Sequence, residues 1–327
     1  MSGTVHMGDV AETRLEHFPV TFFATVMGLA GLTLALHLAA GRFGFGVALA
    51  EGALWLTIAD FGLVAALYAA KALRHRAAVV AEWNHPVKLA FFPAMSISLM
   101  LIGTALRSDY VEAARVVWLI GAGLQAVLFL SVMSGWIGRR PFQPMHISPA
   151  WFIPAVGNIV APLAGVPLGY VELSWLFFAT GLVFWVVLLT LVMNRLIFHD
   201  PLPGRLYPTL VILIAPPAVG FLAWLALNGG SLDAFARVLY YAAVSFAGIV
   251  VLQVPSLMRL PFALSWWALS FPVAALTVAT LRFAALAGSN AHDMAGGALL
   301  ALLVALVAGL IWRTGQAVAR GDICRPE

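Results

Sequence analysis

Charged residues are scarce in this sequence of 327 residues: Asp, Glu, Lys and Arg make up 10% of it, whereas 62% is hydrophobic. A soluble globular domain usually carries about 25% charged residues. Such a composition cannot cover a water-facing surface, so it excludes an ordinary soluble domain. It predicts instead a polytopic membrane protein for which the lipid bilayer is the main solvent.

Cysteine is nearly absent as well. The chain has one, Cys324, so neither an intramolecular disulfide nor a cysteine metal cluster can form. Of the eight histidines only His37 lies within a predicted span, whereas bis-histidine haem ligation needs two at bilayer depth. The net charge of +4 comes from Lys and Arg near the ends of apolar stretches, which membrane insertion explains. We therefore predict no cofactor, no bound metal and no nucleic-acid partner.

Ten stretches are long and apolar enough to cross a bilayer as helices, which takes roughly 17–25 residues. We bounded them by charged residues, because an unpaired charge in hydrocarbon is costly. The sequence predicts a membrane domain over residues 17–318, with short polar tails at 1–16 and 319–327 that we expect to be cytoplasmic. The ten windows are His17 to Gly41, Gly52 to Ala70, Leu89 to Leu106, Val116 to Gly138, one within Pro141 to Val171, Leu173 to Asn194, one within Leu206 to Leu232, Val238 to Met258, Leu260 to Leu281, and Met294 to Trp312.

Lys and Arg are distributed unevenly between the predicted loops. Because positive residues accumulate on the cytoplasmic side, we predict a multi-pass protein of the inner (plasma) membrane with both ends of the chain in the cytoplasm. The ends and the loops that join even to odd spans hold thirteen: Arg14, Lys71, Arg74, Arg76, Lys88, Arg139, Arg140, Arg195, Arg205, Arg259, Arg313, Arg320 and Arg325. The opposite loops hold five: Arg42, Arg107, Arg115, Arg237 and Arg282.

Proline marks every odd-numbered span and is missing from the interiors of the even-numbered ones. The markers recur at about 60 residues, a period that indicates five helical hairpins. They stand in Phe18-Pro19-Val20, Phe92-Pro93-Ala94, Ile153-Pro154-Ala155, Ala215-Pro216-Pro217-Ala218 and Phe271-Pro272-Val273.

Each of these prolines is predicted to kink its helix, because proline removes one intrahelical hydrogen bond and clashes with the preceding turn. The backbone groups freed in this way are tolerated where a helix is buried in protein or lines a wet cavity. We therefore predict five kinked inner helices in a quasi-five-fold arrangement around a central pore, inside five straight outer helices. The alternative is that the prolines reflect only the general enrichment of proline in membrane helices.

Four segments of the odd spans resemble the tellurite-resistance/C4-dicarboxylate transporter family, which includes bacterial TehA-like proteins and the slow anion channels of plant guard cells. The resemblance covers nearly all ten spans, and it implies five hairpins around a pore in a homotrimer with one pore per subunit. The segments are His85-Pro86-Val87-Lys88 with Phe91-Phe92-Pro93-Ala94-Met95-Ser96-Ile97-Ser98, then Phe23 to Leu32, Ser148 to Gly165, and Ser265-Trp266-Trp267-Ala268-Leu269-Ser270-Phe271-Pro272.

The resemblance also implies a gate. In family members a phenylalanine just before the proline of the ninth helix closes the pore at its middle, and Phe271 matches that position. The opposing position on the first helix is commonly glycine in the family, and we assign it here to Thr21. Without the resemblance, Phe271 would be interpreted as one of 21 phenylalanines that pack between helices.

The odd spans contain no interior charge, and the polar residues near their prolines are hydroxyls and one amide. Such groups can donate to a partly hydrated anion without holding it as tightly as a buried Lys or Arg would. This pattern favours passage of small monovalent anions. The alternative is that these side chains bond helix to helix. They are Thr21, Ser96, Ser98, Asn158, Ser270 and Thr277.

Asp60 lies halfway along the second span and is the one charge in the interior of any window. An acid within the membrane is a functional candidate by default, here as a proton relay. The second span belongs to the outer set, however, and the structural alternative is a protonated or hydrogen-bonded acid at a helix–helix contact.

The sequence is compatible to different degrees with three functions. A passive channel for small inorganic anions is favoured by the charge-free, proline-marked helices. A proton-coupled exporter of C4-dicarboxylate, sulfite or a tellurite-like oxyanion is the alternative, although a divalent substrate would favour a fixed cation at the midplane. A membrane enzyme is disfavoured, because no nucleophile–base pair, metal set or phosphate-cradling glycine loop is evident.

Overall fold

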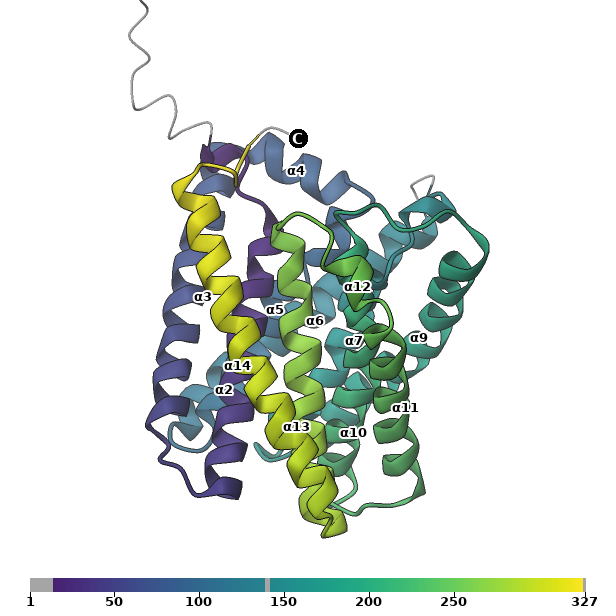
Figure 1. The fold of residues 1–327 in the computed structure, drawn as a ribbon. Helices are drawn as coiled ribbons and strands as arrows, with labels where there is room; N and C mark the ends of the chain where they lie inside the picture. The colour runs from purple at the N-terminus through teal and green to yellow at the C-terminus, as the bar shows by residue number, and fades with distance from the viewer. Residues whose placement is uncertain (1–13, 139–141, 326–327) are drawn as a thin grey trace, which may run out of the picture.

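The computed structural model describes residues 14–138 and 142–325, and every regular element in these ranges is helical (Figure 1). This confirms the all-α membrane fold. Within the described ranges nine helices, not ten, are long and apolar enough to cross a membrane. The fifth predicted span is instead a shorter apolar segment, Pro149–Gly165, in which helical turns of two kinds alternate.

The even-numbered spans are single unbroken α-helices, each followed or preceded by a short connection. Only 22–44% of their most apolar windows is buried inside the protein, so most of their side chains face outward. These outer helices are α3 (Ala48–Arg74), α6 (Val111–Gly138), α9 (Val171–Phe198), α11 (Ala234–Val251) and α14 (Asn290–Ala319).

The odd-numbered spans are built differently, because each begins with one or more 3-10 turns before its α-helix starts. In the four long ones 67–83% of the apolar window is buried. The 3-10 turns and the α-helices that follow them are Val20–Phe22 with α2 (Phe23–Phe43), Lys88–Phe91 with α5 (Ala94–Leu106), Tyr207–Ile214 with α10 (Ala215–Leu227), and Leu264–Leu269 with α13 (Ser270–Ala287). The fifth span runs through Pro149–Trp151, α7 (Phe152–Val156), Gly157–Val160 and α8 (Pro162–Gly165).

The prolines explain these junctions in three of the inner spans. Pro93 directly precedes α5, while Pro216 and Pro272 lie in the first turns of α10 and α13. The first turn of an α-helix has backbone N–H groups without intrahelical partners, so proline fits there at little cost. The predicted kinks are therefore junctions between 3-10 and α geometry, not bends within a continuous α-helix.

Two prolines depart from this rule. Pro19 precedes the first helical turn with extended backbone, so it does not kink a helix, contrary to our expectation. Pro154 lies within α7, and the 3-10 turn Gly157–Val160 follows it directly. The fifth span is thus the most interrupted of the inner segments.

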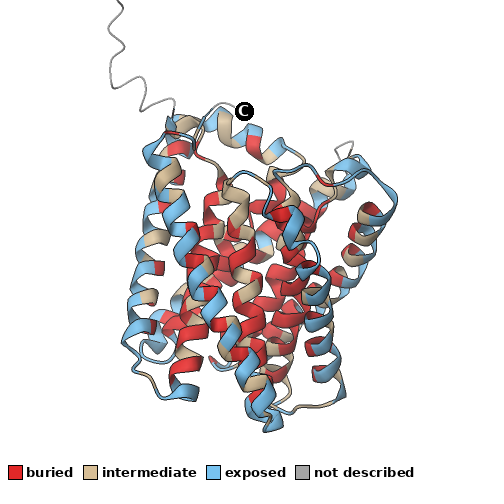
Figure 2. Cartoon of the chain, in the orientation of Figure 1, coloured by how far each residue is buried: buried red, intermediate tan, exposed pale blue. Residues whose placement is uncertain are grey.

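The inner elements contact one another in a closed ring. α2 packs on α5, the segment Gly157–Gly165 packs on both α5 and α10, α10 packs on α13, and α13 returns to α2. Each inner element also packs on the outer helix that follows it in the chain, which gives five hairpins. Figure 2 shows the resulting division, with buried residues gathered in the centre and exposed residues along the outer helices.

Both ends of the described chain lie at the same end of the bundle (Figure 1). Arg14 and Gly321 are so close that a Cβ added to Gly321 would lie 2.7 Å from the Arg14 guanidinium. The short helix α4 (Arg76–Asn84) lies at this end too, and α12 (Val254–Leu257) follows the last turn of α11. Arg139, Arg140 and most of the 1–16 tail lie outside the described residues, as does the end of the 319–327 tail.

Candidate functional site

Phe271 is the second residue of α13, immediately after the change from 3-10 to α geometry. Its side chain is partly buried and packs against the hydrophobic core. Neither of the two cavities that flank α11 is lined by Phe271. The ring therefore belongs to the interior of the bundle, at a point where the helix geometry changes.

Two glycines of α2 allow that helix to approach α13 closely. A Cβ on Gly31 would lie 2.6 Å from the Ala274 Cβ and 3.5 Å from the Phe271 ring. A Cβ on Gly28 would lie 2.7 Å from the Ser270 Cβ. Real Cβ atoms do not come this close, so the contact between these two inner helices requires glycine at both positions.

On the first span, Gly31 therefore lies against Phe271. Thr21 lies ten residues earlier, at the level of the 3-10 turn Leu264–Leu269, which contacts Val20–Phe22. Ten residues of helix rise about 15 Å. A glycine of the first span, which the family resemblance leads us to expect beside Phe271, is thus present at Gly31, and the assignment of that position to Thr21 stays a prediction without a contact to support it. A pore-lining role for Thr21 stays a prediction.

Ser96 and Asn158 take part in a hydrogen-bond network between helices. Ser96 Oγ donates to Gln125 Oε1 at 2.7 Å, and Gln125 Nε2 donates to the Pro154 carbonyl at 2.9 Å. Asn158 Nδ2 donates to the Ala155 carbonyl at 2.9 Å. Gln125 thus stabilises backbone next to the proline of the interrupted fifth span. The sequence holds one signal for this role of Gln125, a polar amide in the middle of the otherwise apolar helix α6.

Three more of the predicted polar residues are also buried and bonded. Ser98 donates to the Ala94 carbonyl, Ser270 to the Trp267 carbonyl and Thr277 to the Val273 carbonyl, at 2.6–2.8 Å. None of the three has exposed surface. In this conformation these hydroxyls satisfy their own helices, which favours the structural alternative; direct contact of these groups with an anion stays a prediction.

Asp60 contacts the inner ring. Thr25 Oγ1 of α2 donates to Asp60 Oδ2 at 2.6 Å. Eight residues further along α2, the hydroxyl of Thr33 lies 3.1 Å from that of Thr57 of α3. The acid is partly buried. It is therefore a hydrogen-bonded acid at a helix–helix contact, as the structural alternative proposed.

A buried ion pair at the end of α3 escaped the sequence analysis. Lys71 Nζ lies 3.0 Å from Glu82 Oε2 of α4 and donates to the Phe18 carbonyl at 2.8 Å, and Tyr68 donates to the same carboxylate. The two charged side chains are only 2% and 7% exposed. The predicted window ends at Ala70, which places Lys71 in a loop. In the structure α3 continues four residues further, to Arg74, so Lys71 is helical. The pair holds α4 and the start of the first span together.

The segment that follows α14 packs near this ion pair. Burial raises the pKa of the Cys324 thiol, and the positive charges of Lys71 and Arg14 offset part of this increase. In the described ranges no three His, Cys, Asp or Glu side chains are grouped so that they could hold a metal ion.

Comparisons with known proteins agree with this architecture. Residues 17–315 match the family SLAC1, described as voltage-dependent anion channel. Among curated relatives, the S-type anion channel SLAH3 of Arabidopsis thaliana is 27% identical over 81% of this chain. An uncharacterized transporter of Methanocaldococcus jannaschii is 24% identical over 97% of this chain and 99% of its own length. The tellurite resistance protein TehA homolog of Haemophilus influenzae is 27% identical over 83% of each chain.

The matched region is 42% of the length of SLAH3 and 44% of the length of the related channel SLAH2, so this chain spans less than half of those two plant proteins. The family match, in contrast, extends from the first inner span into α14 and includes the whole ring. The chain therefore belongs to the SLAC1 family of membrane proteins, as its sequence motifs indicated.

Proposed function

We propose that this protein is an anion channel that passes small inorganic anions along the axis of the inner ring. The observation that carries the proposal is the closed ring of five proline-marked inner segments, whose charged residues lie only toward their ends. A path without a fixed interior charge lets an anion leave as readily as it enters. Family membership supports the same function, since several relatives are S-type anion channels.

The gate in this proposal is Phe271. Its neighbours Gly31 and Ala274 carry no bulky side chains, so the ring is the large apolar group of this contact. A constriction of this kind stops ions by filling or dewetting the path. Because Phe271 follows the change from 3-10 to α geometry, a small change at this junction would move the ring. Pro93, Pro154, Pro216, Pro217 and Pro272 mark the corresponding junctions in the other inner segments and in α13 itself.

The segment Pro149–Gly165 acts as the tenth crossing in this proposal. Its 17 residues rise 1.5–2.0 Å each, so the segment is roughly 26–34 Å long, enough for a hydrocarbon core of about 30 Å. An even number of crossings agrees with the two described ends lying together. We propose that this end is cytoplasmic, in the inner (plasma) membrane, that the ring is quasi-five-fold, and that three copies form a homotrimer with one pore each.

Planar-bilayer recording of the purified protein tests the channel and its gate. Phe271→Ala should raise the anion conductance several-fold over wild type, and Phe271→Leu should raise it less. Phe198→Ala is the matched control, because this exposed ring lies on the outer helix α9, and its conductance should equal that of wild type. Equal conductance of Phe271→Ala and wild type, at equal amounts of incorporated protein, would refute the gate.

The second candidate is a proton-coupled exporter of a C4-dicarboxylate, sulfite or tellurite-like oxyanion. It is favoured by Asp60, an acid in the middle of α3 that bonds to the inner helix α2. Reversal potentials in chloride, nitrate and malate gradients, with and without a pH gradient, separate the two functions. A channel reverses with the anion gradient alone. Reversal that also follows the pH gradient, and loses this dependence in Asp60→Asn, would establish the exporter.

A further inference from the structure

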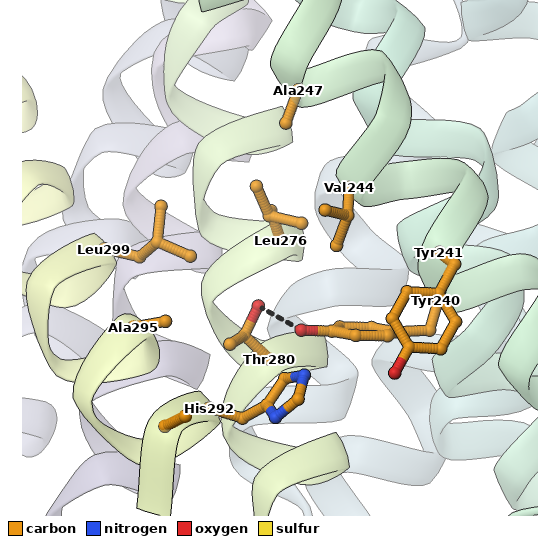
Figure 3. Close-up of a pocket in the computed structure, with 10 residues that line it drawn as sticks. Tyr240, Tyr241, Val244, Ala247, Leu276, Thr280, His292, Ala295 and Leu299 are labelled. Atoms are coloured by element: carbon orange, nitrogen blue, oxygen red, sulfur yellow. Dashed lines mark hydrogen bonds between the residues drawn. The ribbon is translucent and has the colours of Figure 1, made fainter.

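A cavity of about 300 Å³ opens between the outer helices α11 and α14, and its floor is formed by the inner helix α13 (Figure 3). At this cavity a molecule outside the bundle can reach the helix that carries Phe271. The residues that line it are Tyr240, Tyr241, Val244, Ala247, Leu276, Thr280, Ala291, His292, Ala295 and Leu299.

The two ends of this groove differ in chemistry. At the lower end in Figure 3, Tyr240 bonds to Thr280 at 3.4 Å, and His292 Nδ1 lies 2.8 Å from the Ser289 hydroxyl. The upper part in the same view presents the aliphatic side chains of Val244, Ala247, Leu276 and Leu299. The groove is thus amphipathic along its length, with the polar end at the start of α14.

A positive charge stands beside the polar end. The Arg237 guanidinium lies 5.8 Å from the centre of the Phe283 ring, which in turn stacks on Tyr240 at 4.1 Å. In the described part of the chain Arg237 forms no ion pair, and the nearby acids have other partners. Asp293 is paired with Arg42, and Asp233 accepts hydrogen bonds from Ala236 N–H and Trp224 Nε1.

We infer that this groove binds an acyl chain of an anionic phospholipid, with the lipid phosphate on Arg237. The surfaces of α11 and α14 on either side are mostly exposed and apolar, so lipid surrounds the opening. Arg237 lies in the first turn of the membrane helix α11, where we expect headgroups to meet the hydrocarbon. From Tyr241 to Ala247 the helix rises about 9 Å, which gives the chain a path toward the bilayer centre.

The bound chain would contact Leu276 and Thr280 of α13 directly. These residues lie five and nine positions after Phe271 on the same helix. The lipid site itself depends only on the membrane fold, whereas an effect of the lipid on conductance also depends on the proposed gate. Lipid binding and conductance are therefore measured separately.

Native mass spectrometry of the detergent-purified protein tests the site with phosphatidylglycerol and phosphatidylcholine as probes. Ala247→Trp and Ala295→Trp fill the groove and should reduce retained phosphatidylglycerol several-fold. Ala301→Trp is the matched control, because Ala301 lies on the exposed face of α14 and does not line the groove; it should retain lipid like wild type. Retention equal to wild type in both groove variants would overturn the proposal.

Arg237→Gln tests the headgroup without changing the shape of the groove, so it decides the question even if the tryptophan variants misfold. It should abolish the preference for phosphatidylglycerol over phosphatidylcholine and leave phosphatidylcholine retention unchanged. An unchanged preference would overturn the assignment of the phosphate to Arg237. If Ala295→Trp changes the number of subunits instead of the lipid retained, the groove is an interface between copies and the lipid proposal fails.

Discussion

The inner and outer helices of this protein are almost equally apolar, yet they are buried to very different degrees. The four long inner spans bury 67–83% of their most apolar windows, and the five outer helices bury 22–44%. The inner spans change between 3-10 and α geometry near their prolines, whereas the outer spans are continuous α-helices of 18–30 residues. In a bilayer an apolar surface can face lipid or protein, so hydropathy alone does not separate the two sets.

What separates them is backbone chemistry and side-chain size. The inner helices carry the prolines and the small residues that allow close approach, and they place irregular backbone where protein can satisfy it. The outer helices influence the ring only where a side chain reaches inward, as Asp60, Gln125 and Lys71 do. The comparison therefore predicts that substitutions on outer helices matter at these inward contacts and hardly at all elsewhere.

The largest effect is expected at the buried ion pair. Glu82→Gln leaves the Lys71 ammonium buried without a counter-charge, and breaking such a pair typically costs about 3–5 kcal/mol of unfolding free energy. Glu112→Gln is the control, because the Glu112–Arg115 pair is exposed, has N and O atoms 3.6 Å apart, and should contribute about 0–1 kcal/mol. Thermal unfolding in detergent measures both. Equal midpoints for the two variants would contradict the anchoring role of the buried pair.

Gly31→Ala should destabilise the protein next most strongly. The new methyl group would overlap the Ala274 side chain, and overpacking of this kind costs typically about 1–3 kcal/mol. Gly62→Ala on α3 meets nothing within 4 Å and should be neutral or stabilising by up to about 1 kcal/mol. Thermal unfolding of the two variants compares an inner with an outer glycine directly. If Gly62→Ala were the more damaging change, the division between the two sets of helices would be wrong.

Gln125→Leu removes the one outer-helix side chain that bonds to the Pro154 carbonyl and to Ser96. Ser96 keeps the Pro93 carbonyl as an acceptor at 2.8 Å, whereas the Pro154 carbonyl keeps only the 3.4 Å bond from Asn158 Nδ2. Loss of the main partner of this buried carbonyl costs about 1–3 kcal/mol. Thr190→Val on α9 is the matched control, because the Thr190 hydroxyl is exposed and bonds only to the Val186 carbonyl of its own helix. Urea unfolding, monitored by tryptophan fluorescence, should show a lower midpoint for Gln125→Leu than for Thr190→Val.

The smallest effect is expected at Asp233, the N-cap of α11. Hydrogen bonds, first of all the one from Ala236 N–H, hold the pKa of the Asp233 carboxyl below its usual range. A depressed folded-state pKa adds stability above the unfolded-state pKa, and this stability is lost as the pH falls through the folded-state value. Asp233→Asn retains an N-cap acceptor but cannot titrate in this range. The variant should therefore lose less stability than wild type between pH 5 and about 3. Parallel pH profiles of the thermal midpoint would contradict this.

Much of the fold could be predicted from residue patterns. Hydropathy located nine of the ten spans as long helices, and proline parity correctly divided them into an inner and an outer set. The motifs around Pro93 and Pro272 indicated the family, which the match over residues 17–315 confirms. The fifth span stays a prediction, because an apolar stretch containing Pro154 and Gly157 has the hydropathy of a helix without the regular geometry of one.

The candidate site was less predictable. The family resemblance points to Phe271 through its position before Pro272, and its role as a gate stays a prediction. Its neighbour Gly31 on α2 was not predicted, because a motif gives no register between two helices. Gly28 and Gly31 could be recognised as contact residues only once α2 and α13 were in place. The hydroxyls of Ser96 and Ser270 show the same limit: a sequence shows that a polar group is present, but not whether its partner is an anion or a carbonyl three residues away.

By itself, the sequence determined the membrane location, the helical class, the proline-marked hairpins and the family. Low charge and regularly spaced prolines can be recognised from the order of residues alone, without knowing which helices contact each other. The tertiary structure decided which surfaces meet: the closure of α13 onto α2, the Gly31 contact with Phe271, the Lys71–Glu82 pair and the groove beside Arg237. Lys71 and Glu82 are 11 positions apart and Gly31 and Phe271 are 240 apart, so these contacts depend on side-chain volume and helix register in three dimensions.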